Sequence, residues 1–522
     1  MTGPTAIVWL RHDLRLADNP ALAAATGYHR LIPLFIHEEP APRPAGAAGR
    51  WWLEQSLTAL HGELLRLGSG LVCQCGEPEA ILTRMAAEQG ADVYWNRRYG
   101  PERDRDERIQ TALRQAGRTV ACFPGNLLFE PRTVATGSGT PYRVFTPYWK
   151  AVHPRLGEVA PQPAPAELPP LPAGIPADGP PAIADRHPWT GKLADHWQPG
   201  EVGARRRLDA FAGGPMADYP RTRDRPALEG GTSRLSPHLH FGEVTPRQVA
   251  ALALACLDEG HPRDGIETFL QELVWREFAH HILFHFPATA DEPMDPRFTD
   301  FPWRDAPEDL AAWQRCETGI PLVDAGMREL WATGWMHNRV RMVVASLLTK
   351  NLLLPWQRGA EWFEETLVDA DLASNRLGWQ WAAGSGADAA PYFRVFNPVR
   401  QAERFDPDGE YIARWVPELA ALPGKWRRVT RSLEQRGVDK PAERALLLTI
   451  ADASIDRAIE LGQEMQRPEV PSLSGAKSFF KKVGGWIGDT VNNFACDPEA
   501  QQSVSDLSFQ GKASGEKGSY EA

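Results

Sequence analysis

The sequence predicts an α/β fold, in which an N-terminal domain with a parallel sheet precedes a second domain built from helices alone. In the first 150 residues, short apolar runs alternate with amphipathic helical patterns, and this alternation implies a parallel sheet wrapped by helices. Residues 159–185 are mainly proline and alanine, as in an extended linker. From about residue 199 to residue 421 the pattern is helical throughout.

The expected strands of the first domain are residues 6–10, 31–36, 71–75, 93–95 and 119–123. Helical patterns between them cover residues 51–67, 78–89 and 104–115. The first strand is not followed by a GxGxxG segment, so the usual dinucleotide-binding fingerprint is absent and a dehydrogenase is disfavoured.

Four segments follow from these patterns: an α/β domain over residues 1–150, a linker over 151–198, a helical domain over 199–426 and a C-terminal extension over 427–522. Long helical segments are expected at 266–286 and 323–353. In the extension, residues 442–465 favour one helix. Residues 475–494 suit either a short amphipathic helix or a poorly ordered tail, and residues 500–522 are polar and rich in Gly and Ser, which predicts disorder.

Composition narrows the class of protein. The 522 residues are 43% hydrophobic, which is enough for more than one core, and no run of 18 apolar residues predicts a membrane span. The N-terminus lacks a basic leader, and the six cysteines form no CxxC pair, so a reducing cytoplasm is expected. The net charge of −10 argues against nonspecific coating of nucleic acid but allows a local basic groove.

Two polar segments stand out as candidate sites. Residues 9–22 (WLRHDLRLADNPAL) follow the first strand, and an ordinary turn with Asp18 or Asn19 as a helix cap is as good an interpretation as a functional one. In residues 219–242, Gly230 and Gly231 precede hydroxyl side chains where a helix begins. This pattern fits an anion site for a cofactor diphosphate, or simply a glycine turn with a Ser/Thr cap.

Two predicted helices carry polar side chains on one face. Glu272, Trp275 and Arg276 share a face that could stack on and hydrogen-bond a base, although a half-buried helix with an internal ion pair fits equally. Asn338, Arg341 and Met342 also share a face, and a buried Arg341 would need Asp369 or Asp371 as partner. The histidines at 238, 240, 280, 281 and 285 lack an HExxH context, so we expect no metal site.

Taken together, five segments resemble the cryptochrome/photolyase family, and within it the class I cyclobutane pyrimidine dimer photolyases. They are WLRHDLRLADNPAL, EGGTSRLSPHLHFGE, FLQELVWREFAHHIL, TGIPLVDAGMRELWATGWMHNRVRM and DADLASNRLGWQWAAGSGADAAPYFRVFNP. They occur in the family's order and span roughly residues 5–426. The resemblance implies an N-terminal antenna-chromophore domain, a C-terminal helical domain that binds FAD in a bent form, and light-driven repair of UV-damaged DNA by a carbon–carbon lyase.

The resemblance also implies roles for individual residues. The diphosphate and ribityl chain of FAD would be held by Tyr219, Thr232, Ser233, Arg234, Leu235 and Ser236. Other FAD contacts would come from Phe269, Arg276, Arg341, Asp369, Ala370, Asp371 and Asn375, with Arg341 paired to Asp369 and Asn375 facing flavin N5. An electron relay would run from Trp379, nearest the flavin, through Trp356 to Trp313 near the surface.

The dimer pocket implied by the family consists of Glu272, Trp275, Asn338, Met342 and Trp381, with Asn375 beside the flavin. DNA contacts would come from Arg223, Glu272, Trp275, Asn338, Arg339 and Gln401. The (6-4) photolyases carry His where Asn338 and Met342 stand, and protonation of a (6-4) product needs an imidazole, so a cyclobutane dimer is favoured.

Several points stay open at this stage. Glu102 matches a folate-contacting acid, which favours 5,10-methenyltetrahydrofolate as antenna, with 8-hydroxy-5-deazaflavin as the alternative. A signalling cryptochrome without repair activity is the main alternative function, and a nucleotide-binding hydrolase or transferase that does not use light is the second. We expect a monomer in the bacterial cytoplasm that joins the nucleoid when bound to DNA, with no membrane partner.

Overall fold

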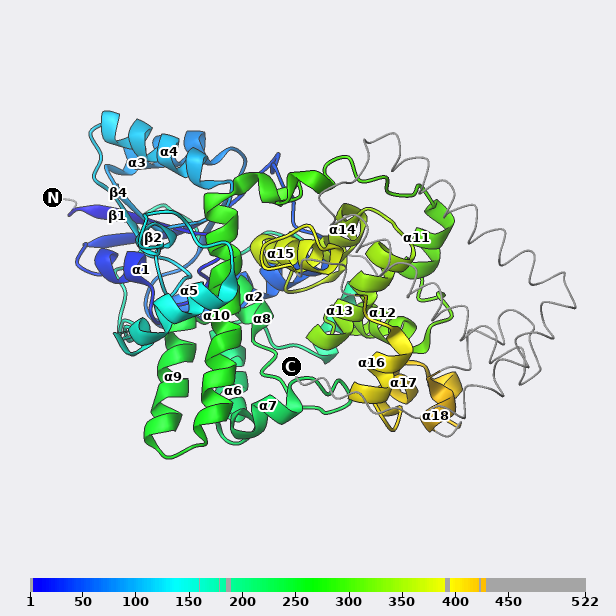
Figure 1. Ribbon diagram of the computed structural model, residues 1–522. Helices are drawn as coiled ribbons and strands as arrows, with labels where there is room; N and C mark the ends of the chain where they lie inside the picture. Colours follow the sequence, from blue (N-terminus) through cyan, green and yellow to red (C-terminus); the bar gives the residue numbers. More distant parts are fainter. Residues whose placement is uncertain are drawn as a thin grey trace, which may run out of the picture.

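The computed structural model describes residues 3–158, 160–177, 179–184, 189–389, 395–421 and 424–428. Figure 1 shows an α/β part at one end, with the long helix α10 (Arg263–His285) between it and the helices of residues 307–415 at the other end. The segments expected at 442–465, 475–494 and 500–522 lie outside the described residues, so those expectations stay predictions.

The N-terminal domain contains a five-stranded parallel sheet with the strand order β3-β2-β1-β4-β5. Its strands are β1 (Thr5–Leu10), β2 (Arg30–His37), β3 (Val72–Cys75), β4 (Asp92–Asn96) and β5 (Val120–Phe123). Each lies within two residues of the strand expected from the sequence. All six residues of β1 are buried, as expected for the central strand of a parallel sheet that is covered on both faces.

Four helices cover the sheet: α1 (Pro20–Ala25), α2 (Ala47–Arg66), α3 (Pro78–Gln89) and α4 (Arg103–Gln115). The bounds of α3 follow from its sequence. Glu77 accepts hydrogen bonds from the backbone of Glu79 and Ala80, Pro78 fixes the first turn, and Gly90 ends the helix at a φ of 60°. One sheet face packs with α2 through Trp52, and the other packs with α3 and α4.

The proline-rich segment runs along the α/β domain without forming a helix or strand in its described residues, 160–177 and 179–184. The Leu168 N–H donates to the Leu67 carbonyl at 3.0 Å, and the Leu31 N–H donates to the Pro170 carbonyl at 3.2 Å. Leu168 and Ile183 are buried in the core that α2 shares. The segment is therefore held to the surface at several points along its length.

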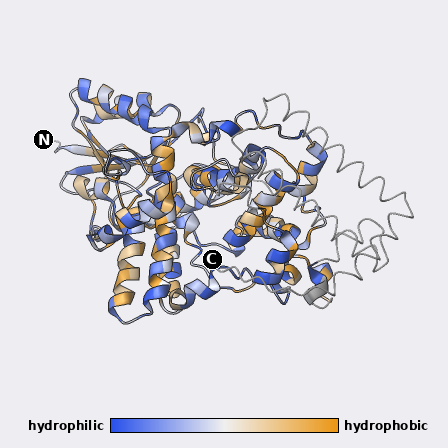
Figure 2. Cartoon of the chain, in the orientation of Figure 1, coloured by the Kyte–Doolittle hydropathy of each residue, from blue (hydrophilic) through white to orange (hydrophobic). Residues whose placement is uncertain are grey.

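The described part of the second domain is helical. Its elements are α6 (Glu201–Ala212), α7 (Tyr219–Thr222), α8 (Ser236–His240), α9 (Pro246–Asp258), α10, α11 (Pro307–Gln314), α12 (Pro321–Thr333), α13 (Asn338–Ser346), α14 (Trp356–Thr366), α15 (Leu372–Ala383), α16 (Pro398–Phe405), α17 (Glu410–Trp415) and α18 (Gly424–Arg427), while α5 (Phe145–Val152) precedes the linker. Figure 2 shows hydrophobic and hydrophilic residues mixed along α9 and α10, as in helices with a buried and an open side. No helix in the described ranges has the length and apolarity that crossing a bilayer requires.

One expectation about this domain was wrong: residues 323–353 do not form one long helix. Gly334 ends α12 at a φ of 68°, a conformation that favours glycine. A new helix, α13, begins at Asn338, where the His337 side chain accepts from the Arg339 N–H at 3.2 Å, and residues 347–351 continue as a π-helical turn. The break places Asn338 at the open start of a helix and Met342 one turn further on.

The two domains meet along a polar contact that we call the domain seam: Arg15, Asp18, Thr245, Arg247 and Glu277. Asp18 accepts hydrogen bonds from Thr245 Oγ1 at 2.6 Å and from Arg247 Nε at 2.9 Å. Arg15 donates to the Gly242 carbonyl at 2.9 Å, and Glu277 accepts from the Leu128 N–H at 2.7 Å. Asn19 caps α1 through the Leu22 N–H, so the segment after β1 caps one helix and joins the domains.

Candidate functional site

The loop expected to hold a diphosphate, Thr232–Ser236, leads into α8, which is only five residues long. Arg234 lies at a φ of 51°, an uncommon conformation for a residue other than glycine. Ser236 Oγ accepts from Trp335 Nε1 at 3.2 Å, and the Leu235 side chain is buried. The Trp335 hydrogen bond and the buried Leu235 side chain therefore hold this loop, and with it the hydroxyl groups, in place.

The aromatic residues expected to contact the cofactor meet next to this loop. Tyr219 on α7 and Phe269 on α10 form an edge-to-face pair with ring centroids 5.6 Å apart. Both rings are buried in one core cluster with Leu235. The structure thus brings α7, α8 and α10 together, as the sequence expectation requires.

The partner of Arg341 is Asp369, as expected. Arg341 Nη2 donates to both carboxylate oxygens, at 2.8 Å and 3.0 Å. Ala370 separates this pair from Asp371, which caps α15 by accepting from the Ser374 N–H at 2.7 Å. The two carboxylates therefore lie at the start of α15 with different partners, and α13 and α15 are joined there.

Asp371 lies in a cluster of histidines drawn from both domains. His280 Nε2 is 3.4 Å from Asp371 Oδ2, and the His12 and His240 rings are 4.9 Å apart. Burial alone raises the pKa of Asp371, but His280, His240 and Arg276 outweigh it and hold that pKa well below its usual value. Burial lowers the pKa of His280 to about 4, so this imidazole is neutral near pH 7.

Two expected flavin contacts have protein partners in the structure. Arg276 donates to the Asn126 carbonyl at 2.9 Å and to Glu277 at 3.2 Å, so its head lies toward the α/β domain. Asn375 Nδ2 donates to the Ala360 carbonyl at 3.1 Å, which orients its side chain against α14. Their contact with a flavin remains a prediction.

The expected electron relay needs one correction. Trp313 was expected near the surface, but its exposed fraction is 0%, and its Nε1 donates to the Val344 carbonyl at 3.3 Å. Its ring lies edge to face with Trp379 at 6.1 Å, so it is a direct neighbour of the innermost indole. Trp356 is also buried in this cluster. The prediction failed because α11 packs its Trp313 face inward.

Trp303, which sequence reasoning missed, is one of the partly buried indoles at the edge of this cluster. It is half-buried and packs against the cluster that holds Trp313, Trp356 and Trp379. The centroid of its ring lies 4.4 Å from that of Phe301. Trp303 lies in the non-helical segment before α11. Such a segment has no helical periodicity from which a buried face could be predicted. The position of Trp303 ten residues before Trp313 was the signal in the sequence, because both indoles are candidates for the same role.

On the side expected to face DNA, four charged residues form a cluster that we call the open ion cluster: Arg223, Asp224, Glu272 and Arg339. Glu272 accepts from Arg223 at 2.5 Å, and Asp224 accepts from Arg339 at 2.9 Å. Burial raises the pKa of the Glu272 carboxyl, which Arg223 only partly opposes. The cluster connects α10 to α13 and carries two positive and two negative side chains.

The remaining expected pocket residues lie on α10, α13 and α15, and α15 packs against both of the other two helices. Trp275 is half-buried on α10, and its ring stacks on Phe145. On α13, Asn338 is exposed and Met342 half-buried. On α15, Trp381 is half-buried and lies 5.9 Å from Phe396.

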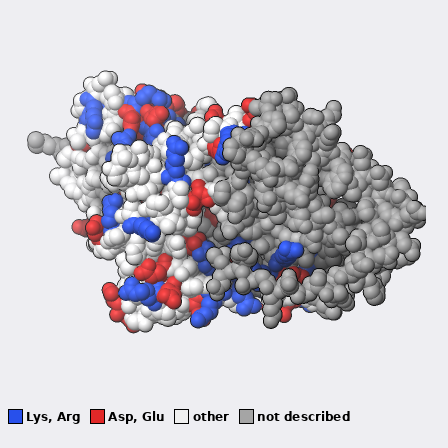
Figure 3. Space-filling model, in the orientation of Figure 1, with Lys and Arg blue, Asp and Glu red and all other residues white. Residues whose placement is uncertain are grey.

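Gln401 and Arg339 lie on neighbouring elements at the same side of the molecule. Arg339 covers the ring of Phe405 at 4.3 Å, and Gln401 lies one turn before Phe405 on α16. Figure 3 shows Lys and Arg interspersed with Asp and Glu over the described part of the face in view, without one sign dominating. The described part of this face therefore carries no patch of a single sign.

Sequence comparisons match this chain to two family models, "DNA photolyase" over residues 6–169 and "FAD binding domain of DNA photolyase" over residues 269–453. A deoxyribodipyrimidine photo-lyase of Agrobacterium fabrum (strain C58 / ATCC 33970) is 44% identical over 89% of this chain and 94% of its own length. Cryptochrome-1 of Arabidopsis thaliana is 38% identical over 81% of this chain and 64% of its own. The crystal structure of a bacterial class III photolyase from Agrobacterium tumefaciens superposes with a TM-score of 0.79 at 42% identity, covering 88% of this chain and 98% of that one.

The chain belongs to the photolyase/cryptochrome family. It has both the DNA photolyase domain and the FAD-binding domain of that family. The sequence expectation of an N-terminal parallel-sheet domain followed by a helical flavin domain is confirmed. The alternative of a nucleotide-binding hydrolase or transferase that does not use light was wrong.

The residues expected to hold FAD fit that cofactor. Hydroxyl side chains at 232, 233 and 236 suit a diphosphate and ribityl chain, and the carboxylates at the start of α15 suit the donor edge of a flavin ring. Trp379 Nε1 is buried and has no hydrogen-bond partner among the residues described, as expected beside a site for a polar ligand. Trp379 also covers Gly359 so closely that a Cβ there would lie 2.1 Å from its ring.

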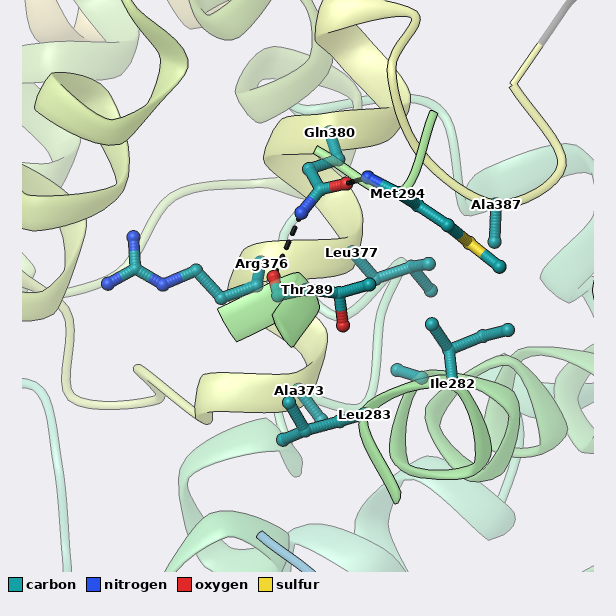
Figure 4. A pocket seen from close by; sticks show the side chains of 10 residues that line it. Ile282, Leu283, Thr289, Met294, Ala373, Arg376, Leu377, Gln380 and Ala387 are labelled. Atoms are coloured by element: carbon teal, nitrogen blue, oxygen red, sulfur yellow. Dashed lines mark hydrogen bonds between the residues drawn. The ribbon is translucent and has the colours of Figure 1, made fainter. Parts of the chain in front are cut away.

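Gln380 is a residue of this site that the sequence did not reveal. Its Nε2 donates to the carbonyls of Thr289 and Glu292, both at 2.9 Å, and its Oε1 accepts from the Met294 N–H at 2.9 Å. Figure 4 shows Gln380 bonded to Thr289 and Met294 above a small cavity between α10 and α15. Because Gln380 lies between Trp379 and Trp381, these bonds fix the rotation of α15 and so the directions of both indoles.

Glu102, the expected antenna residue, lies at the start of α4 and does not cap that helix with its side chain. The next residue, Arg103, donates to the Phe284 carbonyl of α10 at 2.7 Å, so Glu102 lies next to the contact between the two domains. Within the parts of the chain that the structure describes, no three His, Cys, Asp or Glu side chains are arranged to hold a metal ion.

Proposed function

We propose that the protein repairs cyclobutane pyrimidine dimers in DNA with light. One observation carries this proposal: residues expected to bind the flavin and residues expected to bind the dimer lie on the same three helices, α10, α13 and α15. On α10, Phe269 lies near Glu272 and Trp275; on α13, Arg341 lies between Asn338 and Met342; on α15, Asn375 precedes Trp381. Residues suited to a flavin and residues suited to a dimer therefore lie within one or two helical turns of each other.

Bound FAD, reduced and excited by light, would supply the electron that opens the cyclobutane ring. The protein's own residues must accept a flipped-out dimer, whose removal from the duplex costs only a few kcal/mol because damaged bases pair poorly. The Trp275 and Trp381 rings would contact the two bases. Glu272, which pairs with Arg223 in the open ion cluster, would hydrogen-bond the base edge.

A cyclobutane dimer is a better substrate for this site than a (6-4) product. Asn338 and Met342 cannot protonate a lesion, and the adjacent His337 is buried and caps α13 with its Nδ1. Burial lowers the pKa of His337 to about 3, so near neutral pH its ring is neutral and is not the imidazolium acid that would protonate a lesion. None of these three residues provides the acid that a (6-4) lesion needs.

The test is a repair assay on the reduced holoprotein. Irradiation with an oligothymidine that contains dimers should restore the thymine absorbance band, and a protein that restores none would instead fit the signalling cryptochrome. Replacing Trp275 with Ala should weaken dimer binding by about 1–3 kcal/mol, the contribution of one base stacked on an aromatic ring, with flavin content unchanged. Trp331→Ala, an indole that is 41% exposed on α12, is the matched control.

We infer that electrons enter the protein at Trp303 on the surface and reach the flavin site through Trp379. Trp379→Phe should abolish photoreduction of the flavin and spare repair by chemically reduced protein. Trp303→Phe should slow photoreduction at least tenfold, which corresponds to about 1.4 kcal/mol in barrier height. Trp149→Phe, a half-buried indole on α5, should leave the rate unchanged. A normal rate in Trp303→Phe would show that electrons enter the protein at another indole.

An antenna chromophore near Glu102 completes the proposal. We expect 5,10-methenyltetrahydrofolate, with 8-hydroxy-5-deazaflavin as the alternative, and chromatography of the chromophore released by denaturation decides between them. The expectations of a monomeric protein that acts on nucleoid DNA in the cytoplasm stay predictions, which sedimentation and cell fractionation test.

A further inference from the structure

The dimer-facing ring of Trp275 has a close partner on the opposite side of the domain boundary. Phe145, the first residue of α5, stacks on Trp275 with ring centroids 3.6 Å apart and ring planes 8° apart. The Phe145 side chain is 3% exposed, whereas Trp275 is half-buried. One face of the Trp275 ring is therefore covered by Phe145.

This stacking is not the arrangement that two aromatic rings choose by themselves. Aromatic pairs prefer offset or edge-to-face contacts with centroids 4.5–7 Å apart, because face-to-face rings oppose like charge distributions. The surroundings must therefore hold the pair. Phe278 does so from one side, since its ring lies edge-on to both Phe145 and Trp275 at 5.8 Å.

A second residue holds Phe145 from the backbone. The Asp388 carboxyl lies near enough to the Phe145 N–H, at the start of α5 where no helical carbonyl is available, for that N–H to lower its pKa. Asp388 lies at a φ of 55°, which is strained for a residue other than glycine, and such strain persists only where the surroundings impose it. Burial raises the pKa of the Asp388 carboxyl.

Asp388 belongs to the segment that follows α15, the helix of Trp381. Its neighbour Ala387 is buried in the same core cluster as Phe145 and lines the small cavity against Ile282 and Leu377 (Figure 4). The Asp388–Phe145 contact therefore links the end of α15 to the ring of Trp275 on α10. Both indoles expected to contact the dimer are connected through this one joint.

We propose that Phe145 and Asp388 are positioning residues for dimer recognition. Phe145 blocks one face of Trp275 and fixes its ring plane, so that only the opposite face contacts a base. Asp388 fixes the position of Phe145 relative to the end of α15. The inference rests on the proposed function and adds two residues that would touch neither DNA nor flavin.

The experiment uses the flavin-loaded full chain and measures affinity for an oligothymidine with one dimer and for its undamaged counterpart. Phe145→Leu keeps apolar bulk but removes the flat ring, so dimer affinity should fall about tenfold, equivalent to about 1.4 kcal/mol, with undamaged-strand affinity unchanged. Phe145→Tyr should restore it. Asp388→Ala should lower dimer affinity by a smaller factor than Phe145→Leu, and Asp388→Asn, which keeps an acceptor and tolerates positive φ, should restore it. Phe129→Leu, a buried phenylalanine of the same core cluster, is the matched control.

A second readout does not depend on DNA. In holoprotein labelled with 5-fluorotryptophan, the Trp275 resonance is assigned by its loss in Trp275→Phe, and it should broaden or split in Phe145→Leu. If wild type prefers the dimer but Phe145→Leu binds it equally well or more tightly, the inference is overturned while the proposed function stands. If wild type shows no preference, the proposed function fails and this inference fails with it, even where the resonance broadens.

Discussion

The domain seam and the open ion cluster are built from the same chemical pair, an arginine and a carboxylate, but they differ in burial. In the seam, the Asp18 side chain is 2% exposed and accepts from Thr245, Arg247 and the Gln162 N–H. In the open ion cluster, the Asp224 side chain is 34% exposed and pairs with Arg339 alone among the bonds described. The first carboxylate is fully bonded within the protein, whereas the second keeps contact with water.

This difference decides which pair can take part in binding. A buried pair is costly to break, because the remaining charge stays in a poor dielectric without a partner. A half-exposed pair contributes about 0–1 kcal/mol, because water replaces either partner at little cost. The seam can therefore hold the two domains in a fixed relation, while the open ion cluster can exchange a carboxylate for a phosphate.

The largest effect is expected at the seam. Asp18→Ala should lower the free energy of unfolding by about 3–5 kcal/mol, since it leaves Arg247 and Thr245 without their acceptor. Chemical denaturation of the holoprotein measures this. Asp209→Ala, which removes the exposed pair with Arg205, should change the same quantity by less than about 0.5 kcal/mol. Equal effects of the two substitutions would refute the distinction drawn between buried and open pairs.

A smaller effect at the seam depends on pH. Burial raises the pKa of Glu277 to about 7, against the opposing effects of Arg276 and the Leu128 and Phe129 N–H groups. Because the folded pKa lies above the unfolded one, this group's contribution is complete below about pH 4.5 and is lost as pH rises through 7. Between pH 5 and pH 8, wild type should lose up to roughly 3 kcal/mol that Glu277→Gln does not lose.

The comparison to make is the difference between Glu277→Gln and wild type at each pH, because other groups titrate in both proteins. Gln keeps an oxygen that accepts from the same two N–H groups, so the bonds across the seam remain. Glu63→Gln, which removes the exposed pair with Arg66, is the matched control. Parallel curves for Glu277→Gln and wild type would show that Glu277 does not titrate in this range.

The sequence predicted where strands and helices lie better than it predicted where helices break and which side chains are buried. The five strands were found because parallel strands buried on both faces form short continuous apolar runs, as β1 does. The break between α12 and α13 was missed because the apolar pattern continues across Gly334. Its cause is a backbone conformation and a cap from His337, neither of which affects hydrophobic periodicity.

The site residues divide in the same way. The Arg341–Asp369 pair could be anticipated, because a buried guanidinium requires a carboxylate and only two candidates were near in the motif. Trp313 was misplaced, since a tryptophan's depth depends on how its helix packs and not on its spacing from other tryptophans. Gln380 and Phe145 escaped notice because their contacts, Met294 and Trp275, are more than 80 residues away in the chain.

The smallest change in stability, and the sharpest test of the comparison, is expected in the open ion cluster. Asp224→Asn should alter the free energy of unfolding by less than about 1 kcal/mol, since the pair with Arg339 is half-exposed. It should nevertheless raise affinity for DNA a few-fold at low salt, because Arg339 no longer has a carboxylate that competes with a phosphate. Titrations at several salt concentrations measure this, with Asp218→Asn, in the exposed pair with Arg221, as control. If Asp224→Asn weakened DNA binding instead, Asp224 would be needed to hold Arg339 in place, and the open ion cluster would be a structural joint like the seam.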